Sequence, residues 1–241
     1  MKKFSFIPKL ILLSSLLPQI FFPDIALALE PKKLEDVNVD NLVRETQSSD
    51  SQDTITLIWW IPKEFWAISI SKDPSMSAAE RDEFLKILEP YFMLGVVQGK
   101  ISSFGATTFY DLETIKNQLT FSFEDSNGIR KIIEPAQTIS SDVELLQNII
   151  RPMIEQMMGN FGQNFHFLTF EDQNSQGDRH ISPYEEGTII VQLSSDEPQE
   201  DINLTIDLPL DALFVSRICP NGKEAHVSWK YCPWDGTKLE D

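Results

Sequence analysis

Residues 54–70 read TITLIWWIPKEFWAISI, and we expect the core of the protein to form around them. The stretch contains Trp59, Trp60 and Trp66, which are three of the five tryptophans in the chain. Aromatic side chains bury large apolar areas and dominate the energetics of protein cores. Residues 54–61 are β-branched, aromatic or leucine at every position, so they predict a buried strand.

The second half of the stretch predicts a short helix after Pro62. Proline cannot donate to a β-ladder, but it suits the first turn of a helix. Residues 63–67 are therefore expected to form a helix that lays Phe65 and Trp66 on the sheet. The alternative is an exposed aromatic platform for a sugar or a lipid head group. Apolar runs of this kind usually face inward, which favours the core.

Local signals further along the chain predict more helices and strands. Ser77 and Glu80 have the spacing of a capping box, which predicts a helix over residues 78–89. Asn127-Gly128 lies between two alternating runs and predicts a β-hairpin. Further strands are expected over residues 92–97, 101–104, 165–170, 188–193 and 202–208, with a turn at residues 98–100.

The longest helix is predicted over residues 142–158, where Ser141 and Glu144 form a second capping box. Its methionines, Met153, Met157 and Met158, are expected to fill the core, although they also suit an adaptable binding groove. Hairpins combined with helices indicate an α+β fold. We expect residues 54–210 to form one globular domain, an antiparallel sheet with one long and two or three short helices.

The N-terminal region predicts export. Lys2 and Lys3 precede a mostly apolar run over residues 4–22, and Ala26-Leu27-Ala28 has the small-x-small pattern of a cleavage site. Residues 1–28 are therefore predicted to be a signal peptide cleaved after Ala28. An uncleaved anchor is the alternative, although the run is short and interrupted for a spanning helix. Residues 29–53 are polar and are expected to form a disordered tether.

The charge balance excludes one class of partner. The chain has 20 lysines and arginines against 37 aspartates and glutamates, which gives a formal net charge of -17. Nucleic acid binding needs clustered cations, so no nucleic acid partner is expected. After cleavage no second long apolar run remains, so we expect no stable membrane insertion. Localisation in a periplasm, a lumen or outside the cell follows, and the oligomeric state is left open.

The C-terminal segment, residues 211–241, contains both cysteines of the chain. Cys219-Pro220-Asn221-Gly222 and Cys232-Pro233-Trp234-Asp235-Gly236 each start a knuckle-like turn. Residues 218–239 resemble a zinc ribbon, a family that binds zinc through four cysteines. Here each knuckle keeps its first cysteine, and Asp235 stands where the second knuckle has its other ligand. The segment therefore resembles a degenerate ribbon, which predicts a small turn-rich module.

Three states of this module are open. In an oxidising compartment Cys219 and Cys232 would form a disulfide, which closes a loop of about 13 residues and stabilises by about 3 kcal/mol. Alternatively, Cys219, His226, Cys232 and Asp235 would bind zinc, since all four are zinc ligand types. The third state is a pair of free thiols. We expect the disulfide and no cofactor, with zinc as the alternative.

The chain as a whole resembles exported bacterial proteins of unknown activity. The resemblance rests on the IWWIPKEFW opening and the CPWDGT ending, and it implies a shared module without a mechanism. His166 is the one histidine inside a predicted strand and is a weak candidate for a general base. We expect a non-catalytic protein that binds another envelope component. The alternatives are an envelope hydrolase that uses His166 with an unidentified carboxylate, and a metal-binding protein that uses the C-terminal module.

Overall fold

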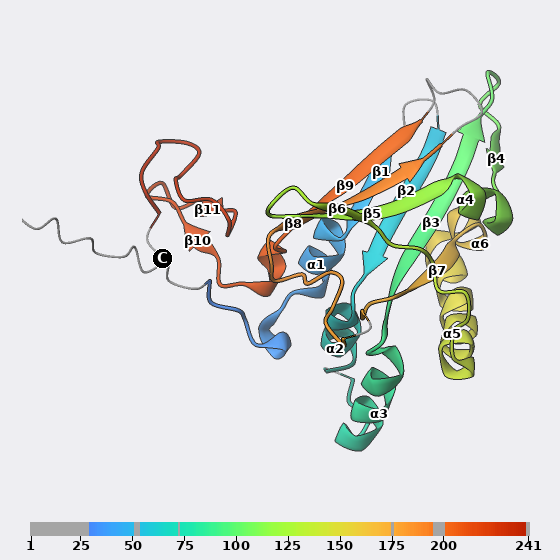
Figure 1. The fold of residues 1–241 in the computed structure, drawn as a ribbon, viewed down its shortest axis with the longest axis horizontal. Coiled ribbons are helices and arrows are strands. Elements are labelled where there is room, and N and C mark those ends of the chain that lie inside the picture. The colour runs from blue at the N-terminus through green and yellow to red at the C-terminus, as the bar shows by residue number, and fades with distance from the viewer. Residues whose placement is uncertain (1–28, 51–53, 72, 175, 195–200, 240–241) are drawn as a thin grey trace, which may run out of the picture.

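The computed structural model describes residues 29–50, 54–71, 73–174, 176–194 and 201–239. The signal peptide expected over residues 1–28 lies outside these ranges. The α+β prediction is confirmed, because helices and antiparallel sheets occur together in the described part of the chain. The prediction of one sheet is wrong, since the domain contains two sheets packed face to face (Figure 1).

The first sheet forms around the aromatic stretch. Strand β2 (Thr54–Ile61) pairs antiparallel with β1 (Gln47–Asp50) on one side and with β3 (Tyr91–Ile101) on the other. The far edge of β3 is shared by β7 (His166–Glu171) and β4 (Thr107–Phe109), which pair with successive parts of it. Both faces of this sheet are covered, which explains why residues 54–61 are apolar at almost every position.

The second sheet has the order β6-β5-β8-β9 and is antiparallel throughout. It contains β5 (Leu119–Asp125), β6 (Arg130–Ile132), β8 (Gly187–Leu193) and β9 (Ile202–Leu208). The predicted hairpin is confirmed as β5 and β6, with Gly128 at a positive φ of 77° in the turn. Side chains in β9 alternate between buried and exposed positions, so the outer face of this sheet is polar.

The helices cover the outer face of the first sheet. They are α2 (Lys63–Ser71), α3 (Ala78–Leu88), α5 (Ser141–Met158) and α6 (Asn160–Gln163), while α4 (Leu112–Gln118) leads into β5. The capping box of Ser77 and Glu80 is confirmed. The cap of α5 is Ser140 rather than Ser141, because the Ser140 hydroxyl accepts the Val143 N–H.

The aromatic stretch supplies side chains to both cores. Ile58 and Trp60 point between the two sheets, while Ile61 and Trp66 pack under the helices. The predicted burial of the stretch is therefore confirmed. Between the sheets, Phe92 from β3, Phe170 from β7 and Phe121 from β5 form a cluster. The distances between ring centroids are 5.0 Å for Phe92 and Phe170, 5.2 Å for Phe92 and Phe121, and 4.8 Å for Phe121 and Phe170. This cluster ties the second sheet to the first.

The disordered tether expected over residues 29–53 is wrong for residues 29–50. This segment forms η1 (Leu34–Asp36), α1 (Val39–Glu45) and β1, and Val37 and Leu42 are fully buried in the main core. Its backbone pairs with the C-terminal region, since Lys32 N donates to Leu213 O at 2.8 Å and Val215 N donates to Glu30 O at 2.9 Å. The polar composition does not predict these contacts, because the backbone makes most of them. Residues 51–53 lie outside the described ranges.

The turn expected at residues 98–100 is also wrong, because β3 continues to Ile101. Gly99 is a strand residue here, and a Cβ on it would lie 3.0 Å from Thr108 O in the neighbouring strand. The chain instead turns at Ser102–Ala106, where Gly105 has a φ of 80°. Gly99 thus permits a close approach of two strands and does not mark a loop.

The C-terminal module begins later than residue 211. Helix η3 (Asp211–Leu213) and Phe214 belong to the main core. Beyond them, β10 (Arg217–Ile218) and β11 (Glu224–Ala225) form a small separate hairpin (Figure 1). The Arg217 guanidinium donates to the carbonyls of Val227, Trp229 and Leu239 and so holds the module together.

Candidate functional sites

Helix α5 carries two apolar ridges, of which the domain buries one. Its sequence contains the pairs Leu145-Leu146, Ile149-Ile150, Met153-Ile154 and Met157-Met158 at intervals of four residues. Because residues four apart lie on one face of a helix, the pairs form two parallel ridges. The second members pack into the core beneath the helices, and the first members face outward.

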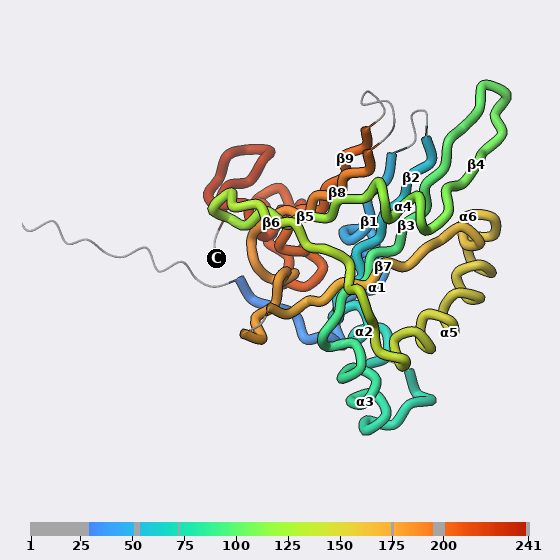
Figure 2. Tube along the Cα trace, turned by 45° about the vertical axis from the view of Figure 1, so that its right-hand side comes forward, coloured from blue at the N-terminus to red at the C-terminus, as the bar shows by residue number. Residues whose placement is uncertain are grey.

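The outward ridge is exposed along its whole length. The exposed fractions are 59% for Leu145, 57% for Ile149, 59% for Met153 and 82% for Met157. The prediction that the methionines fill the core is therefore wrong for Met153 and Met157, while Met158 packs into it. We call these four side chains the α5 ridge. The helix lies at the end of the domain opposite the C-terminal module (Figure 2).

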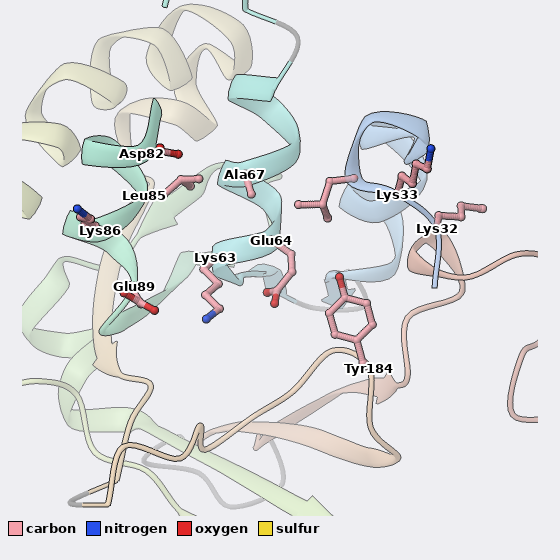
Figure 3. Close-up of a pocket in the computed structure, with 11 residues that line it drawn as sticks. Lys32, Lys33, Lys63, Glu64, Ala67, Asp82, Leu85, Lys86, Glu89 and Tyr184 are labelled. Carbon is pink, nitrogen blue, oxygen red and sulfur yellow. The ribbon is translucent and has the colours of Figure 1, made fainter. Parts of the chain in front are cut away.

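A second candidate site is a cavity of about 630 Å³ beside α2. Figure 3 shows that three helical segments contribute to it, with α2 between α3 and η1, and that the Tyr184 ring faces them. Leu34, Ala67, Leu85 and the Tyr184 ring make its apolar wall. The volume lies within the range of about 300–1,000 Å³ that is typical of small-molecule pockets. We call this space the α2 cavity.

Lysines surround the α2 cavity although the protein is acidic. Lys32, Lys33, Lys63 and Lys86 line it together with the carboxylates of Glu64, Asp82 and Glu89. In the described part of the chain, the ion pairs found involve none of these lysines. Lys32 Nζ donates to the Ala212 carbonyl at 3.3 Å. The chain has almost two acidic groups for each basic one, so four lysines against three carboxylates is a local reversal of the charge balance.

A buried ion cluster lies at the wall of this cavity. Arg179 donates to both oxygens of Glu64, at 2.6 and 3.3 Å, and to Asp172 Oδ2 at 2.7 Å. Burial raises the pKa of Asp172 in spite of the Arg179 charge. Burial alone would lower the pKa of Arg179, but the two carboxylates outweigh the effect of burial and raise this pKa. Burial and the Glu64 charge likewise raise the pKa of Tyr184.

Each cysteine of the C-terminal module starts a tight turn, since Gly222 N donates to Cys219 O at 2.8 Å and Gly236 N donates to Cys232 O at 2.9 Å. Cys219 N donates to Lys223 O and Cys232 N donates to Thr237 O, both at 2.8 Å. Both cysteines are buried and carry free thiols that lie beside each other. Burial, the contact with Cys232 and the charge of Asp235 raise the pKa of Cys219 to about 11.

The predicted zinc ligands are not brought together. Asp235 lies near Cys232, but His226 contacts other groups, with Nδ1 2.7 Å from Ser228 Oγ and Nε2 3.5 Å from Asp211 Oδ1. Within the residues that the structure describes, no three histidine, cysteine, aspartate or glutamate side chains are placed to share a metal ion. The zinc site and the disulfide both stay predictions.

The contacts of His226 form a Ser–His–Asp chain beside a further cavity. This cavity of about 510 Å³ is lined by His226, Ser228 and Trp229 of the module and by residues at the ends of β8 and β9. Asp211 also accepts the Val227 N–H at 2.8 Å, which fixes its carboxylate. No sequence pattern predicts this arrangement, because the usual local motifs of serine hydrolases are missing from the chain.

His166 lies at the start of β7 and outside both of these cavities. Burial lowers its pKa, aided by Arg151 and opposed by a hydrogen bond that the imidazole donates to the Tyr110 carbonyl and by the charge of Asp111. Asp111 is occupied as the cap of α4, where it accepts the Thr114 N–H at 2.8 Å. The structure therefore supplies a nearby carboxylate but gives His166 no place in either cavity.

Comparison with protein families, curated proteins and solved structures finds no match to this chain. None of the helices in the described residues combines the length and apolarity needed to cross a membrane.

Proposed function

We propose that this is a non-catalytic binding protein of the bacterial envelope, and that it binds a protein partner through the α5 ridge. The carrying observation is that α5 has a second apolar ridge that the domain does not bury. A helix needs one such ridge to pack on its own domain, and contiguous exposed apolar surface marks interaction sites. Methionine adapts to differently shaped partners, which suits Met153 and Met157 to this role.

Charge indicates the chemistry of the partner. Helix α5 carries Asp142, Glu144 and Glu155 against a single cation, Arg151, and the whole chain has a net charge of -17. The complementary partner is an amphipathic helix with an apolar face bordered by lysines or arginines. A row of residues at intervals of four packs into the groove of such a helix.

The test uses two synthetic 18-residue helical peptides that share an apolar leucine face. One has lysines on its polar face and the other has glutamates. Calorimetry should show binding of the lysine peptide to the mature protein and none of the glutamate peptide. The variant Ile149→Gln with Met153→Gln removes half of the ridge without changing charge. Each side chain contributes about 1 kcal/mol at this exposure, so binding should weaken by about 30-fold.

A matched control is Ile132→Gln on β6, because Ile132 is 57% exposed, as Ile149 is. It should bind the lysine peptide like the parent protein. Equal loss in the control, or equal binding of both peptides, would overturn the proposal. Sedimentation of the protein alone gives a second check. A parent protein that is dimeric and a ridge variant that is monomeric would mean that the ridge binds a second copy of the chain.

Export is part of this proposal. It is supported by the basic start, the apolar run and the Ala26-Leu27-Ala28 pattern. The intact mass of the protein isolated from its own envelope fraction should match a chain that begins at Leu29. The same spectrum separates the three states of the module, since a disulfide lowers the mass by the mass of two hydrogen atoms and bound zinc raises it. A mass that includes residues 1–28 would contradict cleavage.

A hydrolase is the second candidate, and the contacts of His226 favour it. In that reaction the Ser228 oxygen would attack an ester carbonyl while its proton passes to His226 Nδ1. The alcohol would leave with that proton, and water would then release the acid from the serine. The Asp211 carboxylate would stabilise the charged imidazole from the Nε2 side.

A fluorophosphonate probe tests this candidate directly. A hydrolase of this kind should be labelled at Ser228, and labelling should disappear in Ser228→Ala and fall in His226→Gln. Labelling of neither Ser228 nor any other serine would remove the candidate. The variant His166→Ala tests the alternative that relies on His166, because it should leave binding of the lysine peptide unchanged if the protein acts by binding.

A further inference from the structure

We infer that the α2 cavity is a binding site for an anionic amphiphile, a small molecule with one negative head group on an apolar chain. This goes beyond the docking of a protein on the α5 ridge and does not depend on it. The apolar part of the inference rests on Leu34, Ala67, Leu85 and the Tyr184 ring, which form one wall of a cavity of about 630 Å³.

The anionic part rests on Lys63 and Lys86, for which no ion pair is found among the described residues. Lys63 lies on α2 next to Glu64, among the lining residues labelled in Figure 3, and Lys86 lies on α3. Lys63 is half-buried, so a head group bound to it would be partly shielded from water and salt. The Glu64 carboxylate does not compete for Lys63, because both of its oxygens are bound by Arg179.

The wall is rigid enough to hold a fixed shape. Arg179 joins Glu64 of α2 to Asp172, which follows β7, and the Tyr184 ring packs edge-on against Phe214 at a centroid distance of 5.7 Å. The cavity is therefore braced by elements from distant parts of the chain. A preformed pocket binds with less ordering cost than one that must close around its ligand.

The experiment titrates the mature protein with dodecanoate and with dodecyltrimethylammonium, both below their micelle concentrations. The two probes share a chain length and differ in the sign of the head group. Calorimetry should show saturable binding of dodecanoate at one site per chain, which weakens as salt is added. The cationic probe should bind at least ten-fold more weakly.

Two variants test the two halves of the site separately. Lys63→Gln should weaken dodecanoate binding about five-fold and flatten its salt dependence. Ala67→Phe should fill the cavity and abolish binding, with an unchanged melting curve as evidence that the domain is folded. Lys230→Gln is the matched control, because it removes the same charge from an exposed position in the module and should change nothing.

The possible outcomes separate this inference from the protein-docking proposal. The variant Ile149→Gln with Met153→Gln should bind dodecanoate normally, since the α5 ridge does not line the cavity. Equal binding of both probes would overturn the inference by showing general apolar binding. Binding to phosphatidylglycerol vesicles without binding to monomeric dodecanoate would also overturn it, because the ligand would then be a membrane surface.

Discussion

Removal of Arg179 should destabilise the protein strongly and in a pH-dependent way. In Arg179→Met, the carboxylates of Glu64 and Asp172 stay buried without their cation. Breaking a buried ion pair by removing one partner costs about 3–5 kcal/mol. The stability of a natural domain is about 5–15 kcal/mol, so this loss is a large part of the whole. Urea unfolding should show a midpoint lower by about 2 M.

The pH dependence has a defined sign. Burial already raises the pKa of Asp172 in the folded protein, and loss of Arg179 should raise it further. A carboxyl group with a raised folded-state pKa destabilises the fold at neutral pH, and this penalty fades as pH falls through that pKa. The stability gap between parent and variant should therefore be widest at pH 8 and should narrow at pH 5.

Arg179→Lys is the control for this prediction, because it keeps the charge but loses the planar fork that binds both Glu64 oxygens. It should lose less stability than Arg179→Met. A loss below about 1 kcal/mol in Arg179→Met, or a gap that is the same at pH 8 and pH 5, would refute the reasoning, since the cluster would then not be a desolvated ion pair.

Three further perturbations test other parts of the structure. Leu42→Ala should lower the free energy of unfolding by about 2–5 kcal/mol, measured by urea unfolding, because Leu42 is fully buried, whereas a disordered segment would show no change. Gly95→Ala should cost at least about 1–3 kcal/mol, since a Cβ there would lie 2.0 Å from the Phe165 ring; an unchanged melting temperature would contradict this packing. In the reduced protein, Cys219 should react slowly with iodoacetamide at pH 8 and faster as the pH approaches its pKa of about 11. Fast alkylation of Cys219 at pH 8, measured by mass spectrometry, would contradict its burial.

The sequence could predict those features whose causes are local. The capping box of Ser77 and Glu80, the Asn127-Gly128 turn and the apolar run through Trp60 each depend on neighbouring residues, and each is found in the structure. The polar composition of residues 29–50 predicts disorder, but the buried side chains of Val37 and Leu42 and the backbone pairing of this segment hold it in place. Neither of these features changes the polar composition.

The candidate sites depended on long-range contacts that no local pattern carries. Glu64 and Arg179 are 115 positions apart, and nothing near either residue indicates the other. The two ridges of α5 show a different limit. Their spacing is visible in the sequence, but which ridge faces the core depends on the placement of the first sheet. The sequence spacing therefore predicts the helix but does not predict which of its two ridges faces outward.

Because residues 30–32 pair with residues 213–215, the N-terminal segment cannot complete its folding before the C-terminal region is present. In the export that we propose, the N-terminus crosses the membrane first, so residues 30–32 arrive long before residues 213–215, with which they pair. Until residue 215 has arrived, the N-terminal segment lacks those backbone partners, and Val37 and Leu42 lack part of the core that Leu213 and Phe214 complete. Contacts of such sequence separation slow folding and prolong the life of incomplete states. The released chain should therefore become resistant to protease late and in one step, and a product truncated before residue 211 should stay sensitive.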